Sequence, residues 1–152
     1  MSECSKENVR SLPLVSIITV VYNNAQYIKD SIQSVLSQDY TRLEYVVIDG
    51  GSTDGTVEII EEFRDKISVF MSERDKGIYD ALNKGIQHAS GEVVGILHSG
   101  DLFCNENVVS ASIQQMRDTG SEFCFSDLVI VDASGIRVVR FYMAHYFRRW
   151  MF

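Results

Sequence analysis

Four short polar segments contain most of the residues that could hold an anionic ligand or a metal ion. They are residues 22–24, 49–55, 73–80 and 98–101, and each follows a run of apolar residues. Carboxylates, hydroxyls, amides and a few cations are mixed in them, which suits local binding of a diphosphate, directly or through a divalent ion. Whether the segments meet depends on the elements that precede them.

The apolar runs predict four strands, at residues 15–22, 43–48, 67–71 and 93–97. Their Val and Ile content is typical of strands buried on both faces of a sheet, and we expect residues 93–97 to form a buried strand as well. Between and after the strands, apolar residues recur at helical spacing. These are Ile28, Ile32, Val35 and Leu36; Val57, Ile60 and Phe63; Ile78, Ala81, Leu82, Ile86 and Ala89; and Val108, Val109, Ile113 and Met116. Residues 123–125, 128–131 and 136–141 predict further strands, the last two joined by a hairpin loop at 133–135.

This alternation predicts an α/β fold with a mostly parallel sheet, helices on both faces and a C-terminal β-hairpin. Ligands of such sheets bind beyond the carboxyl ends of the strands. We therefore expect the four polar segments to line one rim of the sheet.

Size and charge narrow the class of protein. A chain of 152 residues with 45% hydrophobic residues predicts a single domain, 1–152. The net charge of −7 argues against a nucleic-acid partner. An anionic ligand must then be held by a metal ion, a helix N-terminus or a few cations.

Three separated cysteines, Cys4, Cys104 and Cys124, predict reduced thiols and a cytosolic protein. Residues 1–12 are too polar for a signal peptide, and no run of about 18 apolar residues could span a bilayer. The aromatic and basic tail, 141–152, predicts packing on further sequence or on a partner. The alternative is peripheral contact with the inner face of the cell membrane. Homo-oligomer formation is left open by the sequence.

Taken in order, the polar segments and their strands resemble the family-2 glycosyltransferases, over residues 14–132. The resemblance is carried by VSIITVVYN at 15–23, VIDGGSTDGT at 47–56, DKGIYDALNKG at 75–85 and LHSGD at 97–101. The third segment resembles a subgroup that builds capsular, colanic-acid-like or O-antigen polysaccharides. The resemblance implies a GT-A-type fold and transfer of a sugar, with inversion, from a nucleotide-sugar to a saccharide or lipid-linked acceptor. A UDP-sugar is the expected donor.

The resemblance implies that Asp49 accepts a hydrogen bond from the donor's base, with Tyr22 and Asn23 lining the same pocket and Ser52 among the donor-binding residues. The alternative is that Asp49 belongs only to a turn with its two following glycines. Asp54 is equally well explained as a helix cap.

The loop before the next helix mixes cations and carboxylates. The resemblance implies that Asp75 and Asp80 contact the donor and that Arg74 or Lys76 lies near its phosphates. Without the resemblance, a solvated charged loop explains the same residues.

Residues 98–101 occupy the place of the family's metal motif, so the resemblance implies Mn²⁺ or Mg²⁺ held by Asp101, with Ser99 and Gly100 near the donor. His98 adds a nitrogen ligand, bonds the donor, or is a strand-end histidine with its own partners. Because Gly100 stands where many relatives have an aspartate, one carboxylate remains. We expect weak metal affinity without nucleotide.

No catalytic base is assigned. The resemblance places it in an acceptor-side region, which we expect this chain to lack, and it does not identify Asp127 or Asp132 as the base. A non-catalytic nucleotide-sugar-binding module is therefore the second hypothesis. A dinucleotide-binding oxidoreductase is disfavoured because no G-x-G-x-x-G follows the first strand.

Overall fold

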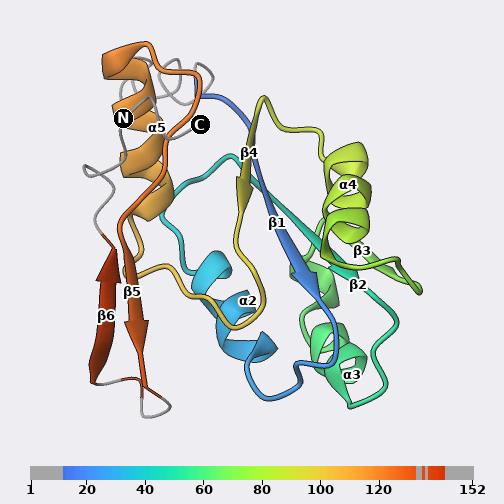
Figure 1. Ribbon diagram of the computed structural model, residues 1–152. Coiled ribbons are helices and arrows are strands. Elements are labelled where there is room, and N and C mark those ends of the chain that lie inside the picture. Colours follow the sequence, from blue (N-terminus) through green and yellow to red (C-terminus); the bar gives the residue numbers. More distant parts are fainter. Residues whose placement is uncertain (1–11, 133–134, 136, 143–152) are drawn as a thin grey trace. The chain divides into compact units, whose positions relative to one another are not determined.

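The computed structural model describes residues 12–132, 135 and 137–142 (Figure 1). Most of the aromatic tail predicted to pack on a partner or a membrane lies outside these residues. The chain divides between Ser110 and Ala111 into two compact units. Among the described helices, none has the length and apolar character needed to cross a membrane.

The first unit contains a four-stranded parallel sheet. Its strands are β1 (Val15–Val21), β2 (Leu43–Asp49), β3 (Val69–Ser72) and β4 (Val93–Ile96), in the order β3-β2-β1-β4. The connecting helices are α2 (Ile28–Leu36), α3 (Thr56–Glu61) with the 3₁₀ helix η1 (Arg64–Lys66), and α4 (Ile78–His88). The α/β alternation predicted from the sequence is confirmed, although β3 begins two residues later than expected.

Helices cover both faces of this sheet, as predicted. The chain moves from β1 through β2 to β3 in one direction and then returns past β1 to β4. Right-handed crossovers therefore place α2 and α3 on one face and α4 on the other. Figure 1 shows α2 and α3 together, apart from α4.

Alternate side chains of β1 and β2 form the two halves of the core. On the α4 face, Ile18, Val20, Val46 and Ile48 pack with Ala81. On the other face, the buried Tyr45 hydroxyl donates a hydrogen bond to Thr19 Oγ1 at 3.1 Å. Burial raises the pKa of Tyr45 to about 12, although the hydrogen bond with Thr19 works in the opposite direction.

Strand β4 is less buried than its sequence predicts. Val94 is 42% exposed and Ile96 is 50% exposed, whereas the residues of β1 are all buried. The expectation of a fully buried strand was wrong because β4 lies at the sheet edge and, in the part of the chain that the structure describes, pairs only with β1.

A second small sheet follows helix α5 (Val108–Thr119), which crosses the division between the units. Strands β5 (Leu128–Val131) and β6 (Val138–Tyr142) pair antiparallel, so the predicted hairpin is confirmed, although part of its loop, 133–134, lies outside the described residues. Residues 123–125 do not form the predicted strand. The rings of Phe123 and Phe125 stack with their centroids 6.3 Å apart.

Candidate functional site

The four polar segments meet at one rim of the parallel sheet, as the sequence predicts. Val21 is in register with Asp49, and Asp49 with Ser72, so these strands end at the same edge. Backbone hydrogen bonds continue past the strand ends, from Gly50 N–H to the Val21 carbonyl at 2.9 Å and from Ser99 N–H to the Val20 carbonyl at 3.3 Å. The loops after β1, β2 and β4 are thereby held beside one another.

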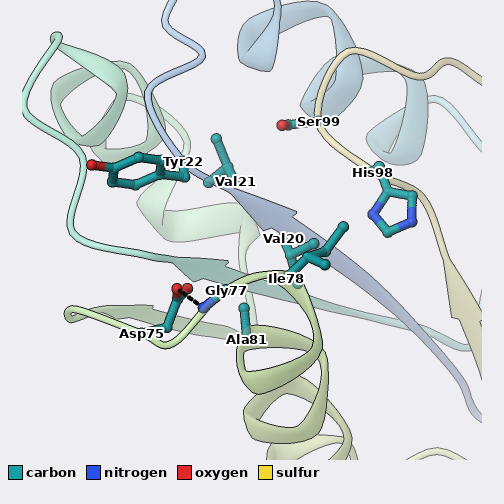
Figure 2. Close-up of a pocket in the computed structure, with 9 residues that line it drawn as sticks. All are labelled: Val20, Val21, Tyr22, Asp75, Gly77, Ile78, Ala81, His98 and Ser99. Atoms are coloured by element: carbon teal, nitrogen blue, oxygen red, sulfur yellow. Dashed lines mark hydrogen bonds between the residues drawn. The ribbon is translucent and has the colours of Figure 1, made fainter.

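A pocket of about 230 Å³ opens at this rim (Figure 2). Its lining residues are Val20, Val21, Tyr22, Asp75, Gly77, Ile78, Ala81, His98 and Ser99. Pockets that enclose a drug-sized ligand hold roughly 300–1,000 Å³. A nucleotide-sugar would therefore extend beyond this hollow.

Three of the predicted donor-binding residues, Tyr22, Asp75 and Ser99, line the pocket, and His98 joins them. The sequence reasoning missed its apolar lining. Helical spacing predicts Ile78 in the core, but it lies in the first turn of α4 and is exposed at the pocket. The available signal was its position directly after a polar loop at the ligand edge.

Asp49 is fully buried and its carboxylate is occupied by the turn that follows it. Oδ2 accepts hydrogen bonds from Gly51 N–H at 3.0 Å, Ser52 N–H at 3.0 Å and the Ser72 hydroxyl at 2.7 Å. Oδ1 accepts a hydrogen bond from the Ser52 hydroxyl. In this arrangement, Asp49 and Ser52 shape the loop between β2 and α3.

The loops after β1 and β2 are bound to each other. Asn23, with a positive φ of 48°, donates its N–H to Ser52 Oγ at 2.7 Å and accepts the Thr53 N–H at 2.9 Å. Asp54 accepts the Ala25 N–H at 3.0 Å and also the Thr56 N–H at the start of α3. The hydrogen bonds from Ala25 and Thr56 hold the pKa of Asp54 below its ordinary value. The N-cap residue of α3 is Gly55, and Asp54, one residue earlier, binds the first N–H of the helix instead of capping it.

The charged loop before α4 is also organised internally. Asp80 accepts the Lys76 N–H at 3.1 Å, and Lys84 lies 2.7 Å from Glu73 Oε1 and 3.7 Å from Asp80. The hydrogen bond with Glu73, together with nearby negative charge, raises the pKa of Lys84. The side chains of Arg74 and Lys76 are exposed, so they are available to an anion.

Helix α2 holds the segment after β4. Asn24 Nδ2 donates to Ser99 Oγ at 3.0 Å, and Gly100 N–H donates to Ser31 Oγ at 2.8 Å. Gly100 has a φ of +95°, a conformation that an aspartate would adopt only with strain. The segment 98–101 therefore has one carboxylate, that of Asp101.

His98 and Asp101 differ in their surroundings. His98 Nδ1 is buried and has no hydrogen-bond partner among the described residues, although the side chain lines the pocket. Asp101 is exposed outside the pocket lining and donates its N–H to the His98 carbonyl at 3.0 Å. No group of three or more His, Cys, Asp and Glu side chains that could hold a metal occurs in the described ranges.

Comparison with known proteins agrees with this geometry. A glycosyltransferase of Mycobacterium tuberculosis is 39% identical over 111 residues, covering 72% of this chain and 42% of the relative. TuaG of Bacillus subtilis, named for teichuronic acid biosynthesis, is 31% identical over 132 residues, covering 85% of this chain and 52% of TuaG. The chain therefore spans about half the length of these curated relatives.

Solved glycosyltransferase structures share the fold. The mannosyltransferase PcManGT of Pyrobaculum calidifontis, in complex with GDP-Man and Mn²⁺, matches with a TM-score of 0.66 and 25% identity, over 82% of this chain and 37% of that chain. S. aureus TarS residues 1–349, in complex with UDP-GlcNAc, match with a TM-score of 0.62 and 28% identity, over 68% of this chain and 31% of that chain. The expected GT-A-type fold is confirmed.

The model of glycosyl transferase family 2 matches residues 16–149, nearly the whole length of the chain. The match spans the parallel sheet, its polar rim and the hairpin. This chain belongs to glycosyl transferase family 2.

Proposed function

We propose that this chain binds a UDP-sugar and serves in transferring the sugar, with inversion, to a saccharide or lipid-linked acceptor during surface polysaccharide assembly. The observation that carries the proposal is the pocket at the carboxyl rim of the sheet, where Tyr22, Asp75, His98 and Ser99 come together. An aromatic ring, a carboxylate and two further polar side chains at that rim suit a nucleotide.

The donor class is supported by relatives of this fold. TarS has been solved with UDP and with UDP-GlcNAc, whereas PcManGT holds GDP-Man. The role in polysaccharide assembly is supported by the name of TuaG and by the DKGIYDALNKG segment at 75–85.

A divalent ion, Mn²⁺ or Mg²⁺, fits the residues after β4. Asp101 offers an exposed carboxylate, and the buried, unpartnered Nδ1 of His98 offers a nitrogen within the described site. Mg²⁺ commonly binds through one or two carboxylates together with substrate phosphates, so a single aspartate suffices. Such an ion would neutralise charge on the leaving diphosphate.

The catalytic base is assigned to no described residue. Asp75 is the only carboxylate among the residues that line the pocket, and it lies on the donor side. We infer that residues 1–152 form a single donor-binding domain, with the base in an acceptor-side region outside this chain. A module that binds the donor without transferring sugar is the competing function.

The free thiols support a proposal for the cellular location. Cys104 and Cys124 are free and exposed in the described structure, which suits a reducing compartment. We propose a cytoplasmic protein whose tail at 141–152 packs on further sequence or on a partner, with contact to the inner face of the membrane as the alternative.

Titration calorimetry with UDP tests the donor site. In Mn²⁺, we expect Asp101→Asn to weaken UDP binding by about tenfold or more, because the ion loses its carboxylate ligand. The matched control is Asp65→Asn, which removes the same charge from exposed η1 and should bind as the unmodified chain does. Absence of UDP binding by the unmodified chain would contradict the proposal.

Transfer is tested separately from binding. Incubation with UDP-GlcNAc and a lipid-linked or saccharide acceptor should release UDP if the chain is active alone, and NMR of the product reports the anomeric configuration. Donor binding without release or transfer favours the non-catalytic module.

A further inference from the structure

We propose that the carboxylate of Asp75, and not that of Asp49, accepts the hydrogen bond of the donor's base, and that Gly50 leaves the space this carboxylate occupies. The proposal rests on the proposed function and names the residue that selects the base. It follows from the different surroundings of two aspartates at the same rim.

Asp49 has little capacity left for a ligand. It is fully buried, and four donors from the chain's own turn and strands bind its two oxygens. A base could reach it only after one of these partly buried hydrogen bonds had broken, which carries a free-energy cost. Asp49 does not line the pocket.

Asp75 has the capacity that Asp49 lacks. Its Oδ1 accepts the Gly77 N–H at 2.8 Å, and Oδ2 accepts no hydrogen bond within the described part of the chain. The residue is half-buried and lines the pocket. Figure 2 shows its carboxylate directed toward the side on which the Tyr22 ring lies.

Gly50 makes this placement of Asp75 feasible. A Cβ atom at Gly50 would lie 2.6 Å from Asp75 Oδ2 and 3.1 Å from its Cγ. Gly50 has no positive φ, so its backbone does not require glycine. A side chain at position 50 would have to displace the Asp75 carboxylate, which lies against Gly50 at the end of β2.

The other residues that line the pocket indicate which part of a nucleotide each end would hold. Tyr22 is 64% exposed and presents an aromatic ring on which a base can stack. His98 and Ser99 lie across the pocket from Tyr22. A diphosphate belongs at the His98 end, away from the Asp75 charge, and the base then lies between Tyr22 and Asp75.

A carboxylate only accepts hydrogen bonds, and this property predicts base preference. Uracil presents an N3–H donor to it, whereas cytosine presents a lone pair at N3 and is repelled there. An asparagine at 75 has both a donor and an acceptor, so it can meet either base. Position 75 should therefore discriminate UDP from CDP.

The test is calorimetry of the whole chain with UDP and CDP at fixed Mn²⁺. We expect the unmodified chain to prefer UDP by about tenfold or more, as for a charge-assisted hydrogen bond, and Asp75→Asn to bring the ratio near one. Asp75→Asn keeps an acceptor for Gly77 N–H, so the loop should fold. The control Asp65→Asn should keep the UDP preference.

A relocated carboxylate provides the second test. Asp75→Ala should lose the preference, and Gly50→Asp added to Asp75→Ala should restore part of it, since the new side chain enters the space that Asp75 left. A purely structural Asp75 predicts no such rescue and no change in the UDP/CDP ratio.

The outcomes separate the two proposals. If the unmodified chain binds neither nucleotide, the proposed function fails and this inference with it. If it binds UDP and Asp75→Asn retains the original UDP/CDP ratio, the inference alone is overturned.

Discussion

Asp49 and Asp75 show how neighbouring donors decide the role of an aspartate. Asp49 meets two backbone N–H groups and two hydroxyls, which leaves it bound within its own turn. Asp75 meets one N–H group and opens onto the pocket. The first therefore supports the rim, and the second is placed to contact a ligand.

Replacing Asp49 should affect stability directly. Asp49→Ala leaves the partly buried N–H groups of Gly51 and Ser52 and the Ser72 hydroxyl without their acceptor, at a cost of about 1–3 kcal/mol in the free energy of unfolding. Urea denaturation measures this cost. Asp101→Ala, which removes an exposed carboxylate, should change it by less than about 0.5 kcal/mol. A cost below about 0.5 kcal/mol for Asp49→Ala would show that the turn does not need the carboxylate.

Helix α4 packs against the sheet and thereby positions the charged loop that precedes it at the pocket. Gly85 allows the close approach: a Cβ atom there would lie 2.5 Å from Ile18 Cγ2 and 3.5 Å from Ile48 Cγ1. Both isoleucines are fully buried, so neither can move aside easily. Eight residues earlier, Gly77 is the N-cap residue of α4, and its N–H donates a hydrogen bond to Asp75.

Gly85→Ala should therefore destabilise the protein, although alanine is the better helix former. Helix propensity favours alanine by about 1 kcal/mol, and overpacking against Ile18 costs about 1–3 kcal/mol. We expect a net loss of roughly 1 kcal/mol, seen as a lower Tm. Gln87→Ala, at an exposed position of the same helix, is the matched control and should leave the Tm unchanged or slightly raised. A higher Tm for Gly85→Ala would mean that the helix can move away from the sheet.

The charge of the whole molecule opposes its proposed ligand. The chain carries a net charge of −7, and UDP is also an anion. Long-range attraction cannot supply the affinity, so it must come from the divalent ion, the exposed Arg74 and Lys76, and contacts to the base.

This balance predicts an unusual salt response. With EDTA present, raising KCl from about 50 to about 300 mM should leave UDP affinity unchanged or slightly higher, because salt screens the net repulsion. Adding Mn²⁺ should then raise the affinity by about tenfold or more. Calorimetry at several salt concentrations measures both effects. A steep fall with salt in EDTA would instead indicate a basic binding surface.

Much of the fold could be predicted from local sequence patterns. Apolar runs followed by polar segments identified the strands of the parallel sheet, and helical spacing identified the helices between them, because these patterns repeat over neighbouring residues. The order of the four motifs was sufficient to identify the family, and the family match over residues 16–149 confirms that identification.

Strand order and the hydrogen bonding of the rim aspartates could not be predicted from local patterns, because both depend on residues far apart in the sequence. Val93–Ile96 reads like Val15–Val21, yet one strand lies at the edge and the other inside the sheet, since strand order depends on pairing between remote segments. In the same way, both Asp49 and Asp75 follow strands in the sequence. Ser72, on another strand, donates a hydrogen bond to Asp49, and Gly50, which has no side chain, leaves the space that the Asp75 carboxylate occupies. Local sequence patterns were enough to predict which residues reach the rim, whereas the atoms that remain free to bind a ligand depend on contacts between distant segments.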